Sequence, residues 1–281
     1  MLHKIIYVQG DKRLPLTPEN GIILTNIDGL TSQNITLDTT KTVNGIGVQV
    51  NTQTVEPKNI SLTGVLLGDS SARRKDLLRT IIPRAVSRLE IDDLYTITVY
   101  PTQTPEIERY SRDAGFSVML RAPFPYFAVQ AEKTEVMMGV TKLFKFPCKL
   151  NSFILGQRMQ LVYKFVNNPG SVACGFTAVI TADGDVVNPK IEHMDTGEYV
   201  MIKKTMHDGD TITYSYLNGR ASVYYAQGDN APENAFSALS IDSVPFELAP
   251  GDNPIKITAA DGYSLLDAFI TFHPVYAGVE Q

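Results

Sequence analysis

Residues 187–223 read VNPKIEHMDTGEYVMIKKTMHDGDTITYSYLNGRASV, and no other stretch says more about the architecture. Apolar and polar residues alternate in short runs, which is the pattern of half-buried β-strands. Turn signals separate the runs, with DTG at 195–197, DGD at 208–210 and NG at 218–219. The Asn218-Gly219 pair is the strongest hairpin signal in the chain. This stretch therefore predicts antiparallel strands joined by tight turns.

Turn signals of the same kind continue on both sides of this stretch. Further turn signals are NNPG at 167–170, ADGD at 182–185, PGDN at 250–253 and DG at 261–262. Short strands with a turn about every ten residues are typical of an antiparallel sandwich or jelly roll. We expect the second half of the chain to be such a sandwich.

The first half also alternates with period two. Residues 45–55 and 59–68 read as two strands joined by a turn at Pro57, and residues 94–100 and 116–120 read as an antiparallel pair. The polar connection 101–114 is long for a hairpin and is either a mobile excursion or a docking arm.

One helix is expected between these strand pairs. Ser70 or Ser71 can cap it, and Pro83 ends it. Its apolar residues are predicted to form one stripe laid on a sheet: Ala72, Leu77, Leu78, Ile81 and Ile82. The basic run Arg73-Arg74-Lys75 is expected on its solvated face. The first half is therefore predicted to be a β-sandwich with one covering helix.

The composition changes at APFPYF, residues 122–127. Two prolines two residues apart exclude both a helix and a central strand, so we place a domain boundary here. The chain is predicted to be mainly β, with an N-terminal domain at 1–128 and a C-terminal domain at 129–281.

Charge is divided unequally between these halves. Residues 1–128 carry 14 Lys and Arg against 13 Asp and Glu, a net of +1, whereas residues 129–281 carry 11 against 17, a net of −6. Clustered basic residues are needed to hold phosphate groups, so tight nucleic-acid binding is not expected. No apolar run reaches the roughly 18 residues of a membrane span, and the N-terminus does not read as a signal peptide. We expect synthesis in a cytoplasm and no insertion into a membrane.

Residues that could carry chemistry are scattered. The chain has no GxSxG elbow and no P-loop, and the glycine pattern that starts at Gly45 lacks its third glycine. Counting from Asp183 in the first DGD turn, the twelfth position, which is glutamate in a calcium loop, holds Met194. Glu106 and Glu108 lack the apolar shielding of a glycosidase pair. No catalytic, metal or cofactor site is predicted among these residues or the four histidines, which are His3, His193, His207 and His273.

Two cysteines, Cys148 and Cys174, are too few for a disulfide framework and lack the spacing of a zinc site. We interpret both as buried free thiols. The chain is therefore not expected to be an enzyme.

A glycan-binding protein is the alternative. Jelly-roll modules bind sugars by stacking aromatic rings on them, and this chain has a tyrosine-rich stretch although it has no tryptophan. Tyr214 and Tyr216 share one strand face, so they are the candidate glycan contacts, whereas Tyr224 and Tyr225 point to opposite faces.

A set of short motifs, in order and spacing, resembles the distal tail protein family of long-tailed phages. In the first half these are IDGLTS (27–32), EPKNISLTGVLLG (56–68), the helix after it and PFPYF (123–127). In the second half they are NNPG (167–170), VVNPKI (186–191), TGEY (196–199), DGDTIT (208–213) and LAPGDN (248–253).

The resemblance implies a structural protein without cofactors, the hub of a siphophage or prophage tail-tip baseplate. The first domain would form a homo-hexameric ring, and the second would be galectin-like. The ring would join the tail tube protein to the tail-tip protein and to receptor-binding proteins, in a virion assembled in the bacterial cytoplasm. Under the alternative, the chain would be a carbohydrate-binding virion component that contacts the host cell wall.

Overall fold

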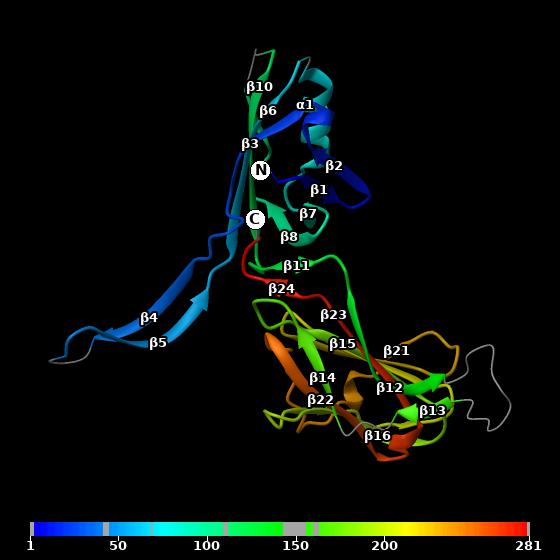
Figure 1. The fold of residues 1–281 in the computed structure, drawn as a ribbon. Coiled ribbons are helices and arrows are strands. Elements are labelled where there is room, and N and C mark those ends of the chain that lie inside the picture. The colour runs from blue at the N-terminus through cyan, green and yellow to red at the C-terminus, as the bar shows by residue number, and fades with distance from the viewer. Residues whose placement is uncertain are drawn as a thin grey trace, which may run out of the picture. The chain divides into compact units, whose positions relative to one another are not determined.

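A computed structural model of the chain describes residues 3–41, 45–68, 70–108, 112–142, 156–159 and 163–279 (Figure 1). The described chain is mainly β-strand, as predicted. It divides into two compact units: unit 1 holds Met1–Ala131 with Val275–Gln281, and unit 2 holds Glu132–Pro274. Among the described residues, no helix is long and apolar enough to cross a bilayer.

Unit 1 is built from antiparallel strands in one hydrogen-bonded path, in the order β2-β1-β7-β8-β10-β6-β3. Strands β4 and β5 pair only with each other. The strands of unit 1 are β1 (Ile5–Gln9), β2 (Lys12–Leu16), β3 (Ile22–Asp28), β4 (Ile35–Lys41), β5 (Val48–Val55), β6 (Lys58–Leu66), β7 (Ser87–Ile91), β8 (Tyr95–Pro101), β9 (Glu106–Ile107), β10 (Ala114–Ala122), β11 (Phe127–Val129) and β24 (Val275–Tyr276).

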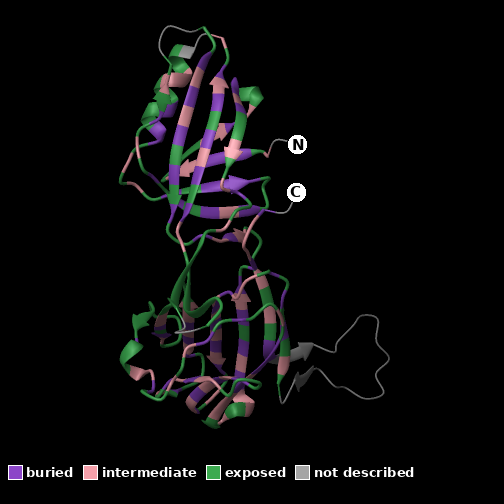
Figure 2. Ribbon diagram, turned by 90° about the vertical axis from the view of Figure 1, so that its left-hand side faces the viewer, coloured by how far each residue is buried: buried purple, intermediate pink, exposed green. Residues whose placement is uncertain are grey.

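The core of unit 1 lies between the two halves of this path. Alternate residues of β6 and β10 point into it, so that Leu62 and Val118 are fully buried, and residues of β1 and β7 such as Tyr7 and Leu89 join the same cluster. Figure 2 shows the alternation as purple bands along the strands. In β6 and β10, period-two alternation in the sequence therefore corresponds to one buried and one outer face.

The single α-helix in the described residues is α1 (Ser70–Thr80), where the sequence predicted it. Leu77 and Ile81 are buried against the sheet, but Leu78 and Ile82 are 49% and 48% exposed. Consecutive residues lie about 100° apart around a helix, so the two i, i+4 pairs face different directions. The prediction of one continuous apolar stripe was wrong for Leu78 and Ile82, and also for Ala72, which is exposed.

The basic run on α1 is not simply a solvated face. Arg73 donates from Nε to the Asn20 carbonyl oxygen at 2.9 Å and also donates to the Leu67 carbonyl oxygen. Arg74 donates to the Glu108 carbonyl oxygen at 2.5 Å. Both guanidinium groups therefore tie α1 to neighbouring loops, and only Lys75 of the three is classed as exposed.

Two predicted strand pairings had different outcomes. Strands β8 and β10 pair antiparallel, with Leu120 opposite Pro101, as expected. The expected pair joined at Pro57 does not form, because β5 pairs with β4 and β6 pairs with β3 and β10. Alternation identifies a strand but carries no information about which other strand it pairs with.

The connection 101–114 is partly attached to the sheet. Its strand β9 pairs with β10, with Ile107 opposite Phe116. Residues 109–111 lie outside the described residues. The described part of this connection is therefore not a free excursion.

The C-terminal residues return to unit 1. Strand β24 pairs with β11, with Tyr276 opposite Phe127, and Val279 is buried in the core of unit 1. The predicted second domain, 129–281, included residues 275–281, which belong to unit 1. It was also predicted to start at 129, whereas unit 2 begins at Glu132. The difference arises because a strand of two residues gives no periodic signal, and only its burial shows where it belongs.

Unit 2 contains two antiparallel sheets, ordered β13-β12-β23-β15-β19-β20-β21 and β14-β22-β16-β17, with β18 paired to β16. Phe246 lies between them, with ring centroids 5.3 Å from Phe176 of β15 and 5.6 Å from His193 of β16. The strands are β12 (Lys133–Lys142), β13 (Gly156–Met159), β14 (Lys164–Asn168), β15 (Phe176–Ala182), β16 (Val186–His193), β17 (Tyr199–Met201), β18 (Thr205–Met206), β19 (Thr211–Leu217), β20 (Arg220–Ala226), β21 (Glu233–Asn234), β22 (Gly251–Asp261) and β23 (Leu266–Phe272). Short 3-10 helices lie at Phe236–Ala238 and Tyr263–Leu265 in unit 2 and at Pro18–Asn20 in unit 1.

The hairpin predicted at Asn218-Gly219 is present. Strands β19 and β20 pair with Leu217 opposite Arg220, and both turn residues have positive φ, 51° and 74°. Asparagine and glycine adopt this conformation readily, which is why the pair is such a strong turn signal.

Two buried asparagines explain the NNPG and PGDN motifs. Asn253 donates to the carbonyl oxygens of Val166, Ala249 and Gly251, and its own oxygen accepts the Ala249 N–H. Asn168 donates to the Leu248 carbonyl oxygen at 2.9 Å. Both residues are only 1% exposed. Their side chains supply hydrogen bonds to backbone carbonyl oxygens.

Candidate functional site

The histidines lie apart from one another. His3 Nδ1 is 2.5 Å from Asp92 Oδ2, and His193 is buried against Phe246. His273 is exposed beyond β23. Across the described ranges, no three His, Cys, Asp or Glu side chains gather where a metal ion could be held.

The two DGD turns come together in unit 2, but their polar groups serve the fold. His207 Nδ1 is 2.7 Å from Asp185 Oδ1, and this hydrogen bond and the nearby charge raise the pKa of His207. Asp210 is 1% exposed; its burial favours the neutral form, but hydrogen bonds from Tyr225 and the His207 and Gly228 N–H groups leave its pKa lowered. These side-chain contacts, together with backbone hydrogen bonds between Ala182 and residues 209–210, hold the two turns together.

The two tyrosines proposed as glycan contacts do not form an open site. Tyr214 is fully buried, with its ring centroid 6.0 Å from that of Phe176, and Tyr216 on the same strand face is half-buried. The proposal for Tyr214 is therefore wrong, because the shared face of β19 points into the sandwich. Tyr224, 44% exposed, points outward from β20.

Cys174 is a free, buried thiol, as expected, and burial raises its pKa to about 12. A thiol held protonated at neutral pH is a poor nucleophile. Cys148 lies outside the described residues.

The most unusual surface of the described chain is the ribbon of β4 and β5, which we call the arm. It runs out from the ends of β3 and β6 (Figure 1). Every residue of both strands is exposed. A two-stranded ribbon without a covering layer is at best marginally stable in water. The arm therefore has the properties of a segment that is completed by another surface.

The register of the arm makes it two-faced. Directly opposed pairs point to the same side, and these include Ile35 with Val55, Thr39 with Val50 and Lys41 with Val48. A bulge between Asp38 and Thr39 shifts β5 by one residue, which brings the valines before and after it onto one side. The exposed apolar side chains of this face are Ile35 53%, Leu37 51%, Val48 52%, Val50 44% and Val55 38%.

The other face of the arm is polar. Thr36 is opposite Thr54, and Thr40 is opposite Gln49. Asn51, at the bulge, donates to the Thr40 hydroxyl oxygen at 2.7 Å. The arm is thus an amphipathic β-ribbon with its apolar face uncovered, a feature that marks a protein interaction surface.

The root of the arm is held by the C-terminal segment. The Val279 N–H donates to the Leu30 carbonyl oxygen, and Lys58 Nζ donates to the Ala277 carbonyl oxygen at 3.2 Å. At Gly29, where φ is +90°, a side chain would clash with the Asn59 carbonyl oxygen at 2.1 Å. The chain thus leaves β3 at a glycine and enters the arm beside residues 277–279.

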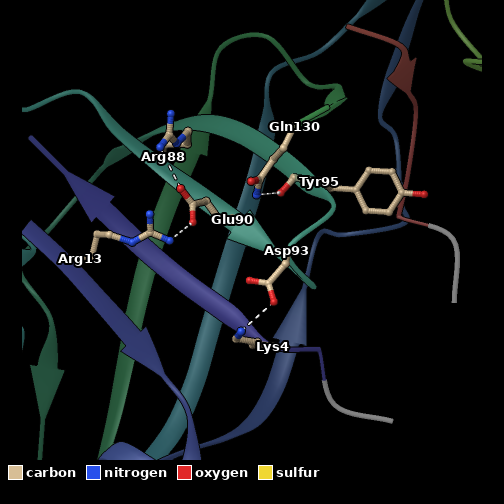
Figure 3. A network of polar contacts seen from close by, with 7 residues as sticks. All are labelled: Lys4, Arg13, Arg88, Glu90, Asp93, Tyr95 and Gln130. Carbon is tan, nitrogen blue, oxygen red and sulfur yellow. Dashed lines mark hydrogen bonds and ion pairs between the residues drawn. The ribbon is translucent and has the colours of Figure 1, made fainter. Parts of the chain in front are cut away.

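A buried carboxylate braces the sheet of unit 1 (Figure 3). Glu90 on β7 has only 5% of its side chain exposed and lies 2.5 Å from Arg13 and 2.8 Å from Arg88. The two guanidinium groups come from different strands, β2 and β7. This triad links strands that are distant in sequence.

Sequence reasoning missed the arm as a site. Strand 45–55 was expected in a sandwich, although five of its eleven residues are Thr, Gln or Asn. No local signal distinguished the arm, because a strand of a sandwich also has one polar face.

Part of the sequence matches a known protein family. Residues 169–276 match the family model of the siphovirus-type tail component, C-terminal domain. The expected family resemblance is confirmed. A search of curated protein sequences found no match.

Solved structures of phage tail proteins share the fold across both units. The crystal structure of the SPP1 Dit protein, described as a paradigm of the hub adsorption apparatus in Gram-positive infecting phages, matches with a TM-score of 0.68 at 12% identity. The match covers 98% of this chain and 99% of that one.

Two structures of the phage p2 baseplate in its activated conformation also match. The structure with Ca has a TM-score of 0.56 at 12% identity, and the match covers 99% of this chain and 100% of that one. The structure with Sr has a TM-score of 0.53 at 12% identity, with 96% and 98% covered. At this identity the likenesses establish the distal tail protein fold.

Proposed function

We propose that this chain is a structural distal tail protein, the hub of a phage tail-tip baseplate, and that it works by self-association and without catalysis. The observation that carries the proposal is the arm, an amphipathic ribbon whose apolar face is uncovered in the single chain. The fold shared with the SPP1 Dit protein supports the same role.

The occupant of the arm's apolar face is, in this proposal, the next copy in a homo-hexameric ring. Covering five half-exposed Val, Leu and Ile side chains would contribute roughly 5 kcal/mol per arm. A head-to-tail contact that closes on itself uses each such surface once per subunit. Six arms would therefore stabilise a ring without any bound cofactor.

Such a ring would join the tail tube protein to the tail-tip protein below and to receptor-binding proteins outside. Each chain carries a net charge of −5, so six copies would carry about −30. Most of this negative charge belongs to residues 129–281, and residues 1–128 are nearly neutral, so the assembly offers no excess of positive charge to hold the phosphates of DNA that passes through it. The proposed location is the virion tail tip, with assembly in the bacterial host cytoplasm.

The test is the solution mass of the full chain, measured by light scattering over a range of concentrations. A ring of six is expected at about 186 kDa, six times the 31.0 kDa of one chain. A chain that stays at the mass of a monomer at every concentration and shows no rings in negative-stain images would overturn the proposal.

The role of the arm is tested with two matched double variants. Ile35→Asn with Val55→Asn changes an opposed pair on the apolar face, and Thr36→Asn with Thr54→Asn changes the neighbouring pair on the polar face. We expect the first variant to dissociate to monomers and the second to keep the wild-type mass. Equal masses for the two variants would show that the arm does not hold the ring.

A further inference from the structure

The outer face of the second sheet of unit 2 carries two uncovered aromatic rings. Tyr163, just before β14, is 45% exposed, and Phe165 on β14 is 55% exposed. Their ring centroids are 5.5 Å apart and their planes meet at 87°. The two rings form a right-angled corner on the sheet surface.

The position of these rings follows from strand register. Phe165 lies opposite Pro254 of β22, whereas Val166 lies opposite Asn253, and both members of that second pair are buried. Alternate residues of β14 therefore point to opposite sides. Tyr163 and Phe165 therefore share the outward side of β14, where their rings are exposed and do not join the core.

Polar side chains of both charges lie on the same face as the corner. Asn167 donates to Asp252 Oδ1 at 2.7 Å beside Phe165. Further along the sheet, Lys256 lies opposite Glu192, which is 3.1 Å from Lys190. The face thus offers hydrogen-bond donors and acceptors but no excess charge of either sign.

We propose that this corner binds a glycan, specifically a neutral chain of pyranose sugars. The faces of aromatic rings are electronegative and attract the weakly positive C–H groups on the flat side of a pyranose. Amide, carboxylate and ammonium groups at the rim then meet the sugar hydroxyls. This site is distinct from Tyr214 and Tyr216, and it is independent of the arm and of ring formation.

The size of the apolar surface favours a glycan over a protein. Two half-exposed aromatic side chains offer roughly 200 Å² of surface. A stable protein interface needs about 800 Å² on each partner. The two positive groups (Lys190 and Lys256) are balanced by two negative ones (Asp252 and Glu192), so these side chains give no net attraction for an anionic ligand.

The test is binding of the full chain to an array of neutral gluco-, galacto-, manno- and N-acetylglucosamine-type oligosaccharides, followed by calorimetry with the strongest binder. We expect Tyr163→Ala and Phe165→Ala each to weaken binding at least tenfold. Tyr224→Ala is the matched control, because this tyrosine is equally exposed on the other sheet of unit 2, and it should bind like the wild type.

Three outcomes would overturn the proposal: no sugar binds, the Phe165→Ala variant binds normally, or the Tyr224→Ala variant loses binding instead. Capture of a protein that is lost in Phe165→Ala, with no sugar bound, would assign the corner to a protein partner and overturn the glycan. The solution mass of every variant is measured in parallel, so a failure of glycan binding is distinguished from a failure of ring assembly.

Discussion

The Val279 N–H donates to the carbonyl oxygen of Leu30 at 3.2 Å, so the end of the described chain is bonded to the segment that leads into the arm. The Val279 side chain is 4% exposed and belongs to the core of unit 1. The C-terminal segment is therefore part of the structure that orients the arm.

Replacing Val279 by Asp should destabilise unit 1 and weaken self-association together. Burying a carboxylate without a partner favours unfolding by about 3 kcal/mol or more. Thermal unfolding and solution mass measure the two effects. Val86→Asp is the control, because that valine is 59% exposed, and it should change neither quantity. A stable Val279→Asp variant that keeps its oligomeric mass would contradict the role given to the C-terminus.

Lys58 gives a pH dependence of known sign. Its side chain is 5% exposed, and burial lowers its pKa below the ordinary 10.5. The unfolded chain therefore binds more protons than the folded one between the lowered pKa and 10.5, and this group's contribution to stability rises with pH across that window.

Lys58→Met removes this contribution, so we expect the stability of the wild type relative to the variant to rise with pH up to about 10.5. Urea unfolding at several pH values measures the difference. Comparing the two proteins cancels the opposite effects of buried groups such as Cys174 and Tyr7, whose raised pKa values lower stability in alkali. A difference that stays constant with pH would refute this account.

Asn253→Asp should destabilise unit 2 by about 3 kcal/mol, because an acceptor would replace the donor that now serves three carbonyl oxygens. The change keeps the shape of the side chain, so it isolates hydrogen bonding from packing. Urea unfolding followed by tyrosine fluorescence measures it. Asn230→Asp, at an exposed position, should leave the curve unchanged. Identical curves for the two variants would mean that Asn253 does not lock its loops.

Cys174 should be inert in the folded protein. In a Cys148→Ser background, a thiol reagent at pH 8 should label the native chain at least a hundredfold more slowly than the urea-unfolded chain, because the thiol is buried and its raised pKa leaves little thiolate. Similar labelling rates in the two states would show that this part of unit 2 opens readily.

Local features were predictable wherever neighbouring residues decide them. The turn at Asn218-Gly219 depends on two adjacent residues that tolerate positive φ, and α1 depends on local propensity before Pro83. The strand content and the family resemblance likewise came from local patterns kept in a constant order.

The candidate site could not be predicted, since exposure is a property of the whole fold. Alternation in 48–55 indicates a strand equally well in a core and in an arm. The bulge that brings Val48 and Val50 to the side of Val55 depends on pairing with β4. Tyr214 and Tyr224 are both strand tyrosines, yet one is buried and the other exposed.

By itself the sequence determined which segments are strands, where the tight turns fall and where the helix lies, because backbone preference and side-chain period act over a few residues. Only the tertiary structure decided that β6 pairs with β3 and β10, that residues 275–279 close unit 1 and that Phe165 faces outward. Those outcomes depend on contacts between segments far apart in the chain, whose free energies no local pattern encodes.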